Sequence, residues 1–195
     1  TMKIKEYGAV DLFRLPAAFM VVAIHTGPFA AWNGFADFLF SYCLCRVAVP
    51  FFLITTGFFV LGPGRGEALC RYLKKTLLLY TAVTLLYAPV SWYAGNLPGN
   101  AAEAFRQIFF DGTFYHLWYF PAALLGCVLT TFLLKRSVKA AILFAVCAYL
   151  VGLGGDSYYG IVCRADWINT AYDGIYFVSS YTRNGIFYAP VFLLM

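Results

Sequence analysis

Arg14 and His25 are separated by ten residues within one long apolar stretch of the sequence. In a helix, an eleven-residue step is about 1,100°, or three turns plus roughly 20°. Both side chains therefore point to the same side, about 16 Å apart along the axis. Ionisable groups inside a membrane-length segment are costly, and by default they mark a functional site. A guanidinium suits phosphate binding, and an imidazole can move a proton near neutral pH.

A second arginine, Arg46, lies inside the next apolar stretch. If that stretch enters from the outer face at Phe38, Arg46 lies about 12 Å below this face and His25 about 10 Å below it. We therefore expect the two residues at similar depth. We find no central Asp or Glu in the predicted spans to neutralise Arg46, so a further helix or an anionic ligand would supply the negative charge.

Both residues of the first stretch also have simpler structural interpretations. Arg14 can extend to the cytoplasmic headgroups, and Asp11, three residues earlier, can pair with it across one helical turn. His25 can be a neutral histidine that is hydrogen-bonded between helices. However, His25 is expected roughly 20 Å from the inner boundary, past the middle of the bilayer, where a polar side chain is hardest to explain.

The composition defines the environment of these residues. The chain is 62% hydrophobic and only 12% charged, whereas soluble domains carry about 25% charged residues. The sequence therefore predicts an all-α, multi-pass bundle of transmembrane helices with the lipid bilayer as its surroundings. The six cysteines show no metal-ligand spacing and there are only two histidines, so we expect no metal. Glycine-rich nucleotide-binding motifs are absent, and we expect no nucleic acid partner.

Five stretches have about the twenty residues that a bilayer requires, and a sixth begins near Gly185. The two long connections, Gly95–Tyr115 and Asp156–Asn184, are expected on the outer side. The first contains a short segment around Ala102–Phe110 that could lie flat in the interface. The predicted spans are Leu12–Trp32, Phe38–Leu61, Lys75–Ala94, His116–Leu134 and Ala140–Gly155.

The basic residues predict the orientation. With the N-terminus in the cytoplasm of a bacterial cell and the spans in the plasma membrane, nine of the 14 Lys and Arg residues fall on the inner side, three on the outer side and two inside spans. This distribution agrees with the positive-inside rule. The nine inner residues are Lys3, Lys5, Arg65, Arg71, Lys74, Lys75, Lys135, Arg136 and Lys139.

Three motifs in order resemble the acyltransferase-3 family of integral-membrane acyltransferases. The first is the Arg-x10-His element with its opening Asp11-Leu-Phe-Arg-Leu-Pro-Ala-Ala. The second is Arg46-Val-Ala-Val-Pro-Phe-Phe-Leu-Ile-Thr-Thr-Gly-Phe-Phe, in which Thr56 replaces the usual Ser. The third is His116-Leu-Trp-Tyr-Phe-Pro. The resemblance implies that residues 1–195 form an acyltransferase-3-like transmembrane domain, incomplete at its C-terminal end.

Within that family, the chain most resembles the N-terminal membrane part of VanT-type serine racemases from vancomycin-resistance operons. The phrase Tyr181-Thr-Arg-Asn-Gly-Ile-Phe-Tyr-Ala-Pro-Val-Phe contributes to this similarity. In such proteins a cytoplasmic, pyridoxal-phosphate-dependent racemase domain follows. No part of such a racemase domain is present in these 195 residues, so the resemblance assigns no bound cofactor to this chain. The resemblance also implies that the chain is a fragment.

The resemblance implies transfer of an acyl group, often acetyl, from cytoplasmic acyl-CoA to a hydroxyl acceptor on the outer side. Arg14 would bind the donor phosphates. His25 would remove the hydroxyl proton or first accept the acyl group. Arg46 would bind the donor or stabilise oxyanion charge. His116 and Trp118 would contact the acceptor or serve as interfacial anchors.

Two other functions stay open from the sequence. A membrane part of this kind could deliver L-serine to a fused racemase domain, because polar groups at mid-depth also suit an amino-acid carboxylate. It could also be a simple anchor that retains the motifs. The Arg-x10-His element favours acyl transfer. The sequence also lacks the paired broken helices that mark a transport site in the middle of the membrane.

Overall fold

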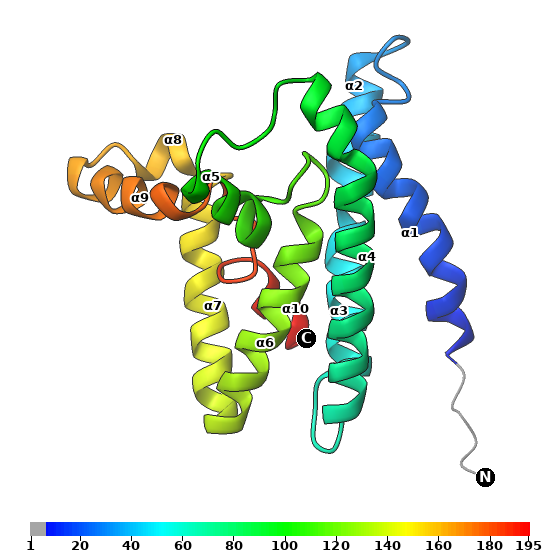
Figure 1. The fold of residues 1–195 in the computed structure, drawn as a ribbon, viewed down its shortest axis with the longest axis vertical. Helices are drawn as coiled ribbons and strands as arrows, with labels where there is room; N and C mark the ends of the chain where they lie inside the picture. Colours follow the sequence, from blue (N-terminus) through cyan, green and yellow to red (C-terminus); the bar gives the residue numbers. More distant parts are fainter. Residues whose placement is uncertain (1–6) are drawn as a thin grey trace. The chain divides into compact units, whose positions relative to one another are not determined.

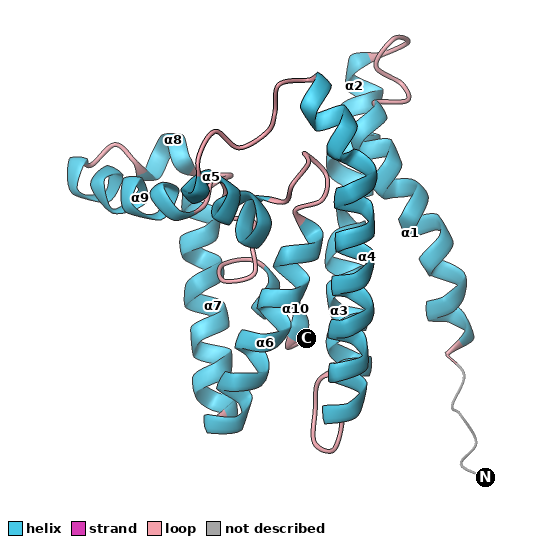
Figure 2. Cartoon of the chain, viewed as in Figure 1, coloured by secondary structure: helices cyan, strands magenta, loops and turns pink. Residues whose placement is uncertain are grey.

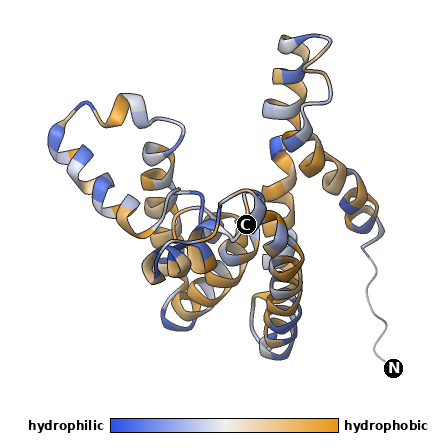
Figure 3. Ribbon diagram, turned by 45° about the horizontal axis from the view of Figure 1, so that its top comes forward, coloured by the Kyte–Doolittle hydropathy of each residue, from blue (hydrophilic) through white to orange (hydrophobic). Residues whose placement is uncertain are grey.

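The computed structural model describes residues 7–195, so Lys3 and Lys5, which the orientation argument uses, lie outside the described residues. The described part of the chain is built of helices and loops and contains no strand (Figure 2). Five of its helical stretches are long and apolar enough to cross a membrane. This confirms the predicted all-α, multi-pass membrane fold. Figure 3 shows hydrophobic residues covering much of these helices, with hydrophilic residues gathered at helix ends and connections.

The five spanning stretches agree with the predicted ones in order but differ at their ends (Figure 1). The second is continuous from Gly34 to Val60 and consists of α2 (Gly34–Asp37), the π-helical η1 (Phe38–Leu44), the 3-10 turn η2 (Cys45–Val47) and α3 (Ala48–Val60). The others are α1 (Gly8–Thr26), α4 (Gly66–Tyr93), α6 (Tyr119–Arg136) and α7 (Val138–Gly155).

The end of α1 falls six residues before the predicted Trp32 because of Gly27. Its φ of 55° is left-handed, and its N–H donates to the Ala23 carbonyl. This closes the helix in the way that glycine favours. In contrast, α4 begins at Gly66 rather than at Lys75. Three basic residues predicted for the inner side, Arg71, Lys74 and Lys75, therefore lie on its first turns, and Arg65 directly precedes it.

Both long connections contain short helices. The first holds α5 (Ala101–Arg106) and the π-helical η3 (Gln107–Asp111), which fit the expected segment around Ala102–Phe110. The second holds α8 (Tyr159–Val162) and α9 (Asp166–Val178), which the sequence analysis did not predict. The last apolar stretch forms α10 (Ala189–Leu193).

Contacts divide the chain into two compact units, Thr1–Thr56 and Gly57–Met195, and each is described by itself. In the first unit α1 packs against η1 and η2. Ala17, Cys45 and Ala48 are fully buried. Small side chains of this kind allow helix backbones to approach closely in a membrane protein.

The second unit is organised around α6, which packs against α4, α7, α10 and η3. Small buried side chains again make the contacts. A Cβ added at Gly126 would come within 2.6 Å of the Ala189 Cβ, and one added at Gly185 within 2.6 Å of the Leu125 Cβ. The two glycines therefore allow α10 and the turn before it to lie directly on α6.

The helices α8 and α9 lie across one end of α7 (Figure 1). The Tyr172 hydroxyl donates to the Val151 carbonyl at 2.7 Å, and the Tyr176 hydroxyl donates to the Gly155 carbonyl. Burial raises the pKa of Tyr176 to about 12, and nearby Tyr159 adds to the shift. The hydroxyl is therefore protonated, and able to donate, throughout the physiological range.

We predict that Gly126→Ala weakens the packing of α10 on α6. The added methyl group would lower the free energy of unfolding by about 1–3 kcal/mol, because the close contact is with another Cβ. Gly174→Ala is the matched control, since Gly174 is also inside a helix and has nothing within 4 Å of an added Cβ. Thermal unfolding in detergent measures both, and equal melting temperatures would contradict the prediction.

Candidate functional site

The first predicted site residue, Arg14, forms an ion pair with Asp11, at 2.6 Å between Nη1 and Oδ1. This confirms the pairing across one turn. Both side chains are about half exposed, at 48% and 61%, so the pair is a weak contributor to stability. A guanidinium fork is chemically suited to a phosphate.

One helix, α1, carries both Arg14 and His25, so the helical spacing argument applies to them. His25 lies in the last turn and its side chain is exposed. The backbone carbonyl of Ala23, two residues earlier, lies 3.5 Å from the Ser41 hydroxyl of η1.

Arg46 lies where the second spanning stretch changes its winding, on η2 directly after η1. Its guanidinium carbon lies 5.4 Å from the centroid of the Tyr42 ring, a cation–π contact. The predicted spans offered no carboxylate for this cation, and the structure gives it an aromatic face instead. π-helical insertions occur frequently at functional sites.

The depth expected for Arg46 needs correction. Phe13 contacts Phe51, with ring centroids 4.8 Å apart, and Ala23 faces Ser41. This antiparallel register places Arg46 opposite the turn around Ala18, roughly one turn from Arg14 and two from His25. The estimate from sequence failed because α1 ends at Thr26 and the next helix already begins at Gly34. The three residues thus form a series, with Arg46 in the middle.

Sequence reasoning missed Asp37, which it assigned to the end of an outer loop. Asp37 is only 7% exposed. Its Oδ1 accepts hydrogen bonds from the Phe29 N–H at 3.1 Å and from the Ser41 hydroxyl at 3.2 Å. The i, i+4 spacing of Asp37 and Ser41 directly after an Asn cap was the available signal.

In the second unit, a row of polar side chains on α4 holds the chain before α6. The Tyr80 hydroxyl donates to the Ile108 carbonyl at 3.1 Å, and the hydroxyls of Thr84 and Thr113 lie 2.8 Å apart. The row is spaced i, i+4, i+7, so it occupies one face of the helix. It continues at Tyr87, which contacts His116.

His116 and Trp118 both take part in packing. The Nε2 of His116 lies 3.2 Å from the Tyr87 hydroxyl, and its ring meets Phe114 edge-on. Trp118 contacts Tyr188 edge-on, with centroids 5.9 Å apart. Both side chains are half-buried. These are packing contacts within the second unit, and both expected roles, contact with an acceptor and anchoring at the interface, stay predictions.

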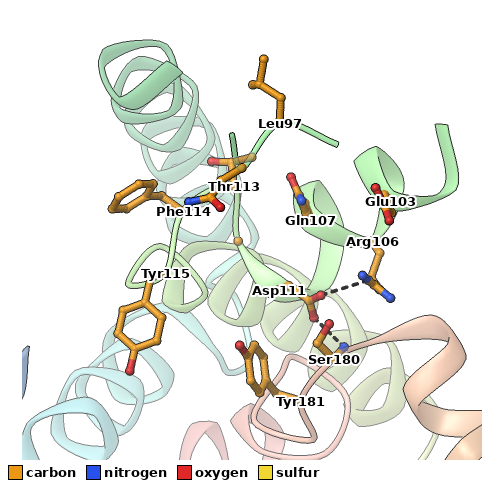
Figure 4. A pocket seen from close by; sticks show the side chains of 12 residues that line it. Leu97, Glu103, Arg106, Gln107, Asp111, Thr113, Phe114, Tyr115, Ser180 and Tyr181 are labelled. Atoms are coloured by element: carbon orange, nitrogen blue, oxygen red, sulfur yellow. Dashed lines mark hydrogen bonds and ion pairs between the residues drawn. The ribbon is translucent and has the colours of Figure 1, made fainter. Parts of the chain in front are cut away.

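A cavity of about 370 Å³ lies between the two long connections (Figure 4). An ion pair joins Arg106 Nε to Asp111 Oδ2 at 3.3 Å, and Asp111 Oδ1 accepts the Ser180 N–H at 2.8 Å. Asp111 therefore ties η3 to the segment before α10. Other charged and polar residues also line the cavity: Asn96, Glu103, Gln107, Thr113, Tyr115 and Tyr181.

Asn184, which is 1% exposed, holds the segment that contains the cavity residues Ser180 and Tyr181. Its Nδ2 donates to the Ser179 hydroxyl and to the Tyr181 carbonyl, and its Oδ1 accepts the N–H groups of Ile186 and Phe187. All the hydrogen-bonding groups of the amide are therefore used. From the sequence, this segment is notable only for its similarity to a family, and the hydrogen bonds of Asn184 become apparent only in the folded turn.

Among the described residues, no group of three His, Cys, Asp or Glu side chains is placed to hold a metal ion. All six cysteines lie in this part of the chain, and all are unpaired.

Comparisons with known proteins agree with the motifs. An amino-acid racemase of Enterococcus faecalis is 40% identical over 198 residues, and a second amino-acid racemase of that organism is 44% identical over 196. A serine/alanine racemase of Enterococcus gallinarum is 35% identical over 197. The matches cover 99%, 95% and 95% of this chain, which spans 28% of the length of each relative.

No solved structure matches this chain. The model of the acyltransferase-3 family, described as an acyltransferase domain, matches residues 7–194. That range includes every predicted site residue and nearly all of both units of the structure. The chain belongs to the acyltransferase-3 domain family.

Proposed function

We propose that this chain is a membrane domain that transfers an acyl group, in the first instance acetyl, from cytoplasmic acyl-CoA to a hydroxyl acceptor on the outer side. The observation that carries the proposal is the series Arg14, Arg46 and His25 along one antiparallel helix pair. Along this helix pair, two cations that suit a polyanionic donor come first, and His25, which can accept a proton, comes last.

The proposed reaction is direct transfer. His25 takes the proton of the acceptor hydroxyl while the oxygen attacks the thioester carbonyl. Arg46 stabilises the negative charge that develops on the carbonyl oxygen, where water is scarce and electrostatic interactions are strong. The carbon–sulfur bond then breaks, and the departing CoA sulfur receives the proton from His25. Arg14 holds the donor through its phosphates.

The orientation is part of this proposal. With the N-terminus in the cytoplasm of a bacterial cell, Arg14 lies toward the side where acyl-CoA is present. The two long connections, with the polar cavity between them, then face outward. The basic first turns of α4, with Arg71, Lys74 and Lys75, face inward, in agreement with the positive-inside rule.

Native cysteines test the orientation. In a variant that keeps only Cys163, between α8 and α9, a membrane-impermeant maleimide is expected to label intact cells. In the matched variant that keeps only Cys70, on the first turns of α4 and exposed, it should label only permeabilised cells. The reverse pattern would show that the N-terminus is outside.

His25→Ala is expected to lower acyl transfer by about 10²–10⁴-fold, the range for loss of a general base. The measurement is release of CoA thiol from acetyl-CoA in membrane vesicles that contain the protein and the cell's own acceptors. Thr26→Ala, on the same exposed turn, is the matched control and should keep activity. A folded His25→Ala protein with normal transfer would refute the catalytic assignment.

A second candidate function is delivery of L-serine to a fused racemase domain. The cavity of the second unit favours it, because Arg106 is suited to a carboxylate and Asp111 and Glu103 to an ammonium group. The relatives' names, amino-acid racemase and serine/alanine racemase, agree with an amino acid as the solute. In this case the longer protein would carry the racemase chemistry.

Arg106→Gln separates the two functions. If the domain delivers serine, this change should reduce L-serine uptake into proteoliposomes about tenfold or more, because a charge-assisted contact is lost. Arg164→Gln, at an exposed arginine in the other connection, is the matched control. Uptake that is absent from the unaltered protein, or equal in both variants, would exclude delivery through this cavity.

A further inference from the structure

Asp37 is a carboxylate buried in a predominantly apolar chain. It is 7% exposed, and none of the ion pairs in the described part of the chain involves it. A buried carboxylate without a cation is unfavourable unless donors satisfy it. The cap of α2 does not explain it either, since Asn33 already accepts the N–H groups of Phe35 and Ala36.

The partners of Asp37 all belong to the first unit and lie around the end of α1. Its Oδ1 accepts the Phe29 N–H at 3.1 Å and the Ser41 hydroxyl at 3.2 Å. Ser41 Oγ is also 3.5 Å from the Ala23 carbonyl oxygen, but a hydroxyl has one proton, and the shorter contact to a carboxylate takes it. Oδ2 faces Gly27, where an added Cβ would lie 3.4 Å away.

These contacts lie close to His25 along the chain. Ala23 precedes it by two residues, Gly27 ends the helix two residues later, and Phe29 lies in the turn that follows. The hydrogen bond from the Phe29 N–H to Asp37 holds the backbone after His25 against the start of η1. Asp37 therefore acts on the direction of the His25 side chain through the backbone.

We propose that Asp37 is a positioning residue that fixes the last turn of α1 and thereby aims the His25 imidazole at the acceptor hydroxyl. The inference rests on the proposed function for its effect on rate, but the clamp itself is a structural claim that can be tested separately. A misplacement of about 1 Å in a reacting group can change a rate about 100-fold.

The two hydrogen bonds to Asp37 allow two substitutions to be distinguished. Both end on Oδ1, so Asp37→Asn keeps both acceptor contacts, whereas Asp37→Ala removes them. We expect Asp37→Ala to reduce kcat for acyl transfer about tenfold or more with little change in KM for acetyl-CoA, and Asp37→Asn to stay within about threefold of the unaltered protein. Ser41→Ala, which removes one of the two donors, should fall between them and serves if Asp37→Ala does not fold.

A readout that does not depend on activity uses the two histidines. In protein labelled with ¹⁵N-histidine, Asp37→Ala is expected to shift or broaden the imidazole signals of His25 and leave those of His116 unchanged. Histidine-to-glutamine variants assign the signals. Normal kcat in folded Asp37→Ala, an unchanged His25 signal, or Asp37→Asn as impaired as Asp37→Ala would each overturn the proposal. If His25→Ala retains transfer, the proposed function fails. The His25 signal in the Asp37 variants still tests whether Asp37 fixes the last turn of α1.

Discussion

The structure depends on one constraint: polar groups in an apolar chain must find their partners within the protein. Water is not present in the bilayer core to satisfy them. The structure meets this constraint at the turns, where single buried side chains close the backbone. Asp37 holds the turn after α1, and Asn184 holds the turn before α10. In the sequence between these two residues, hydroxyls on one face of α4 hold the chain that leads into α6.

Each of these hydrogen-bonded turns also lies next to a residue or cavity that is a candidate for function. The turn at Asp37 follows the helix end that carries His25, and the row on α4 ends at the Tyr87 hydroxyl, which contacts His116. Asn184 donates to Ser179 and to the Tyr181 carbonyl, on either side of Ser180, and both Ser180 and Tyr181 line the polar cavity. The groups that satisfy the backbone are therefore the same groups that order the candidate sites, so a change at one of them affects folding and site geometry together.

Much of the fold could be predicted from the sequence because hydrophobic length and basic residues are properties of single segments. The order of the five spans and the pairing of Arg14 with Asp11 follow from spacing alone. The level of Arg46 does not, since it depends on where α1 ends and on how the second helix is wound. A π-helical segment followed by a 3-10 turn has no simple residue pattern. Asn184 was equally hidden, because its four hydrogen bonds become visible only when the turn is folded.

The two histidines show why residue type alone does not assign a role. His116 is half-buried, contacts a tyrosine hydroxyl and packs between aromatic rings, so its ring has fixed neighbours within its own unit. His25 is exposed at the end of a helix, and the turn after that helix is held by Asp37. A general base must reach a substrate proton and yet keep a defined direction. The proposed function assigns this role to His25 on the basis of its exposure and of the turn that follows it.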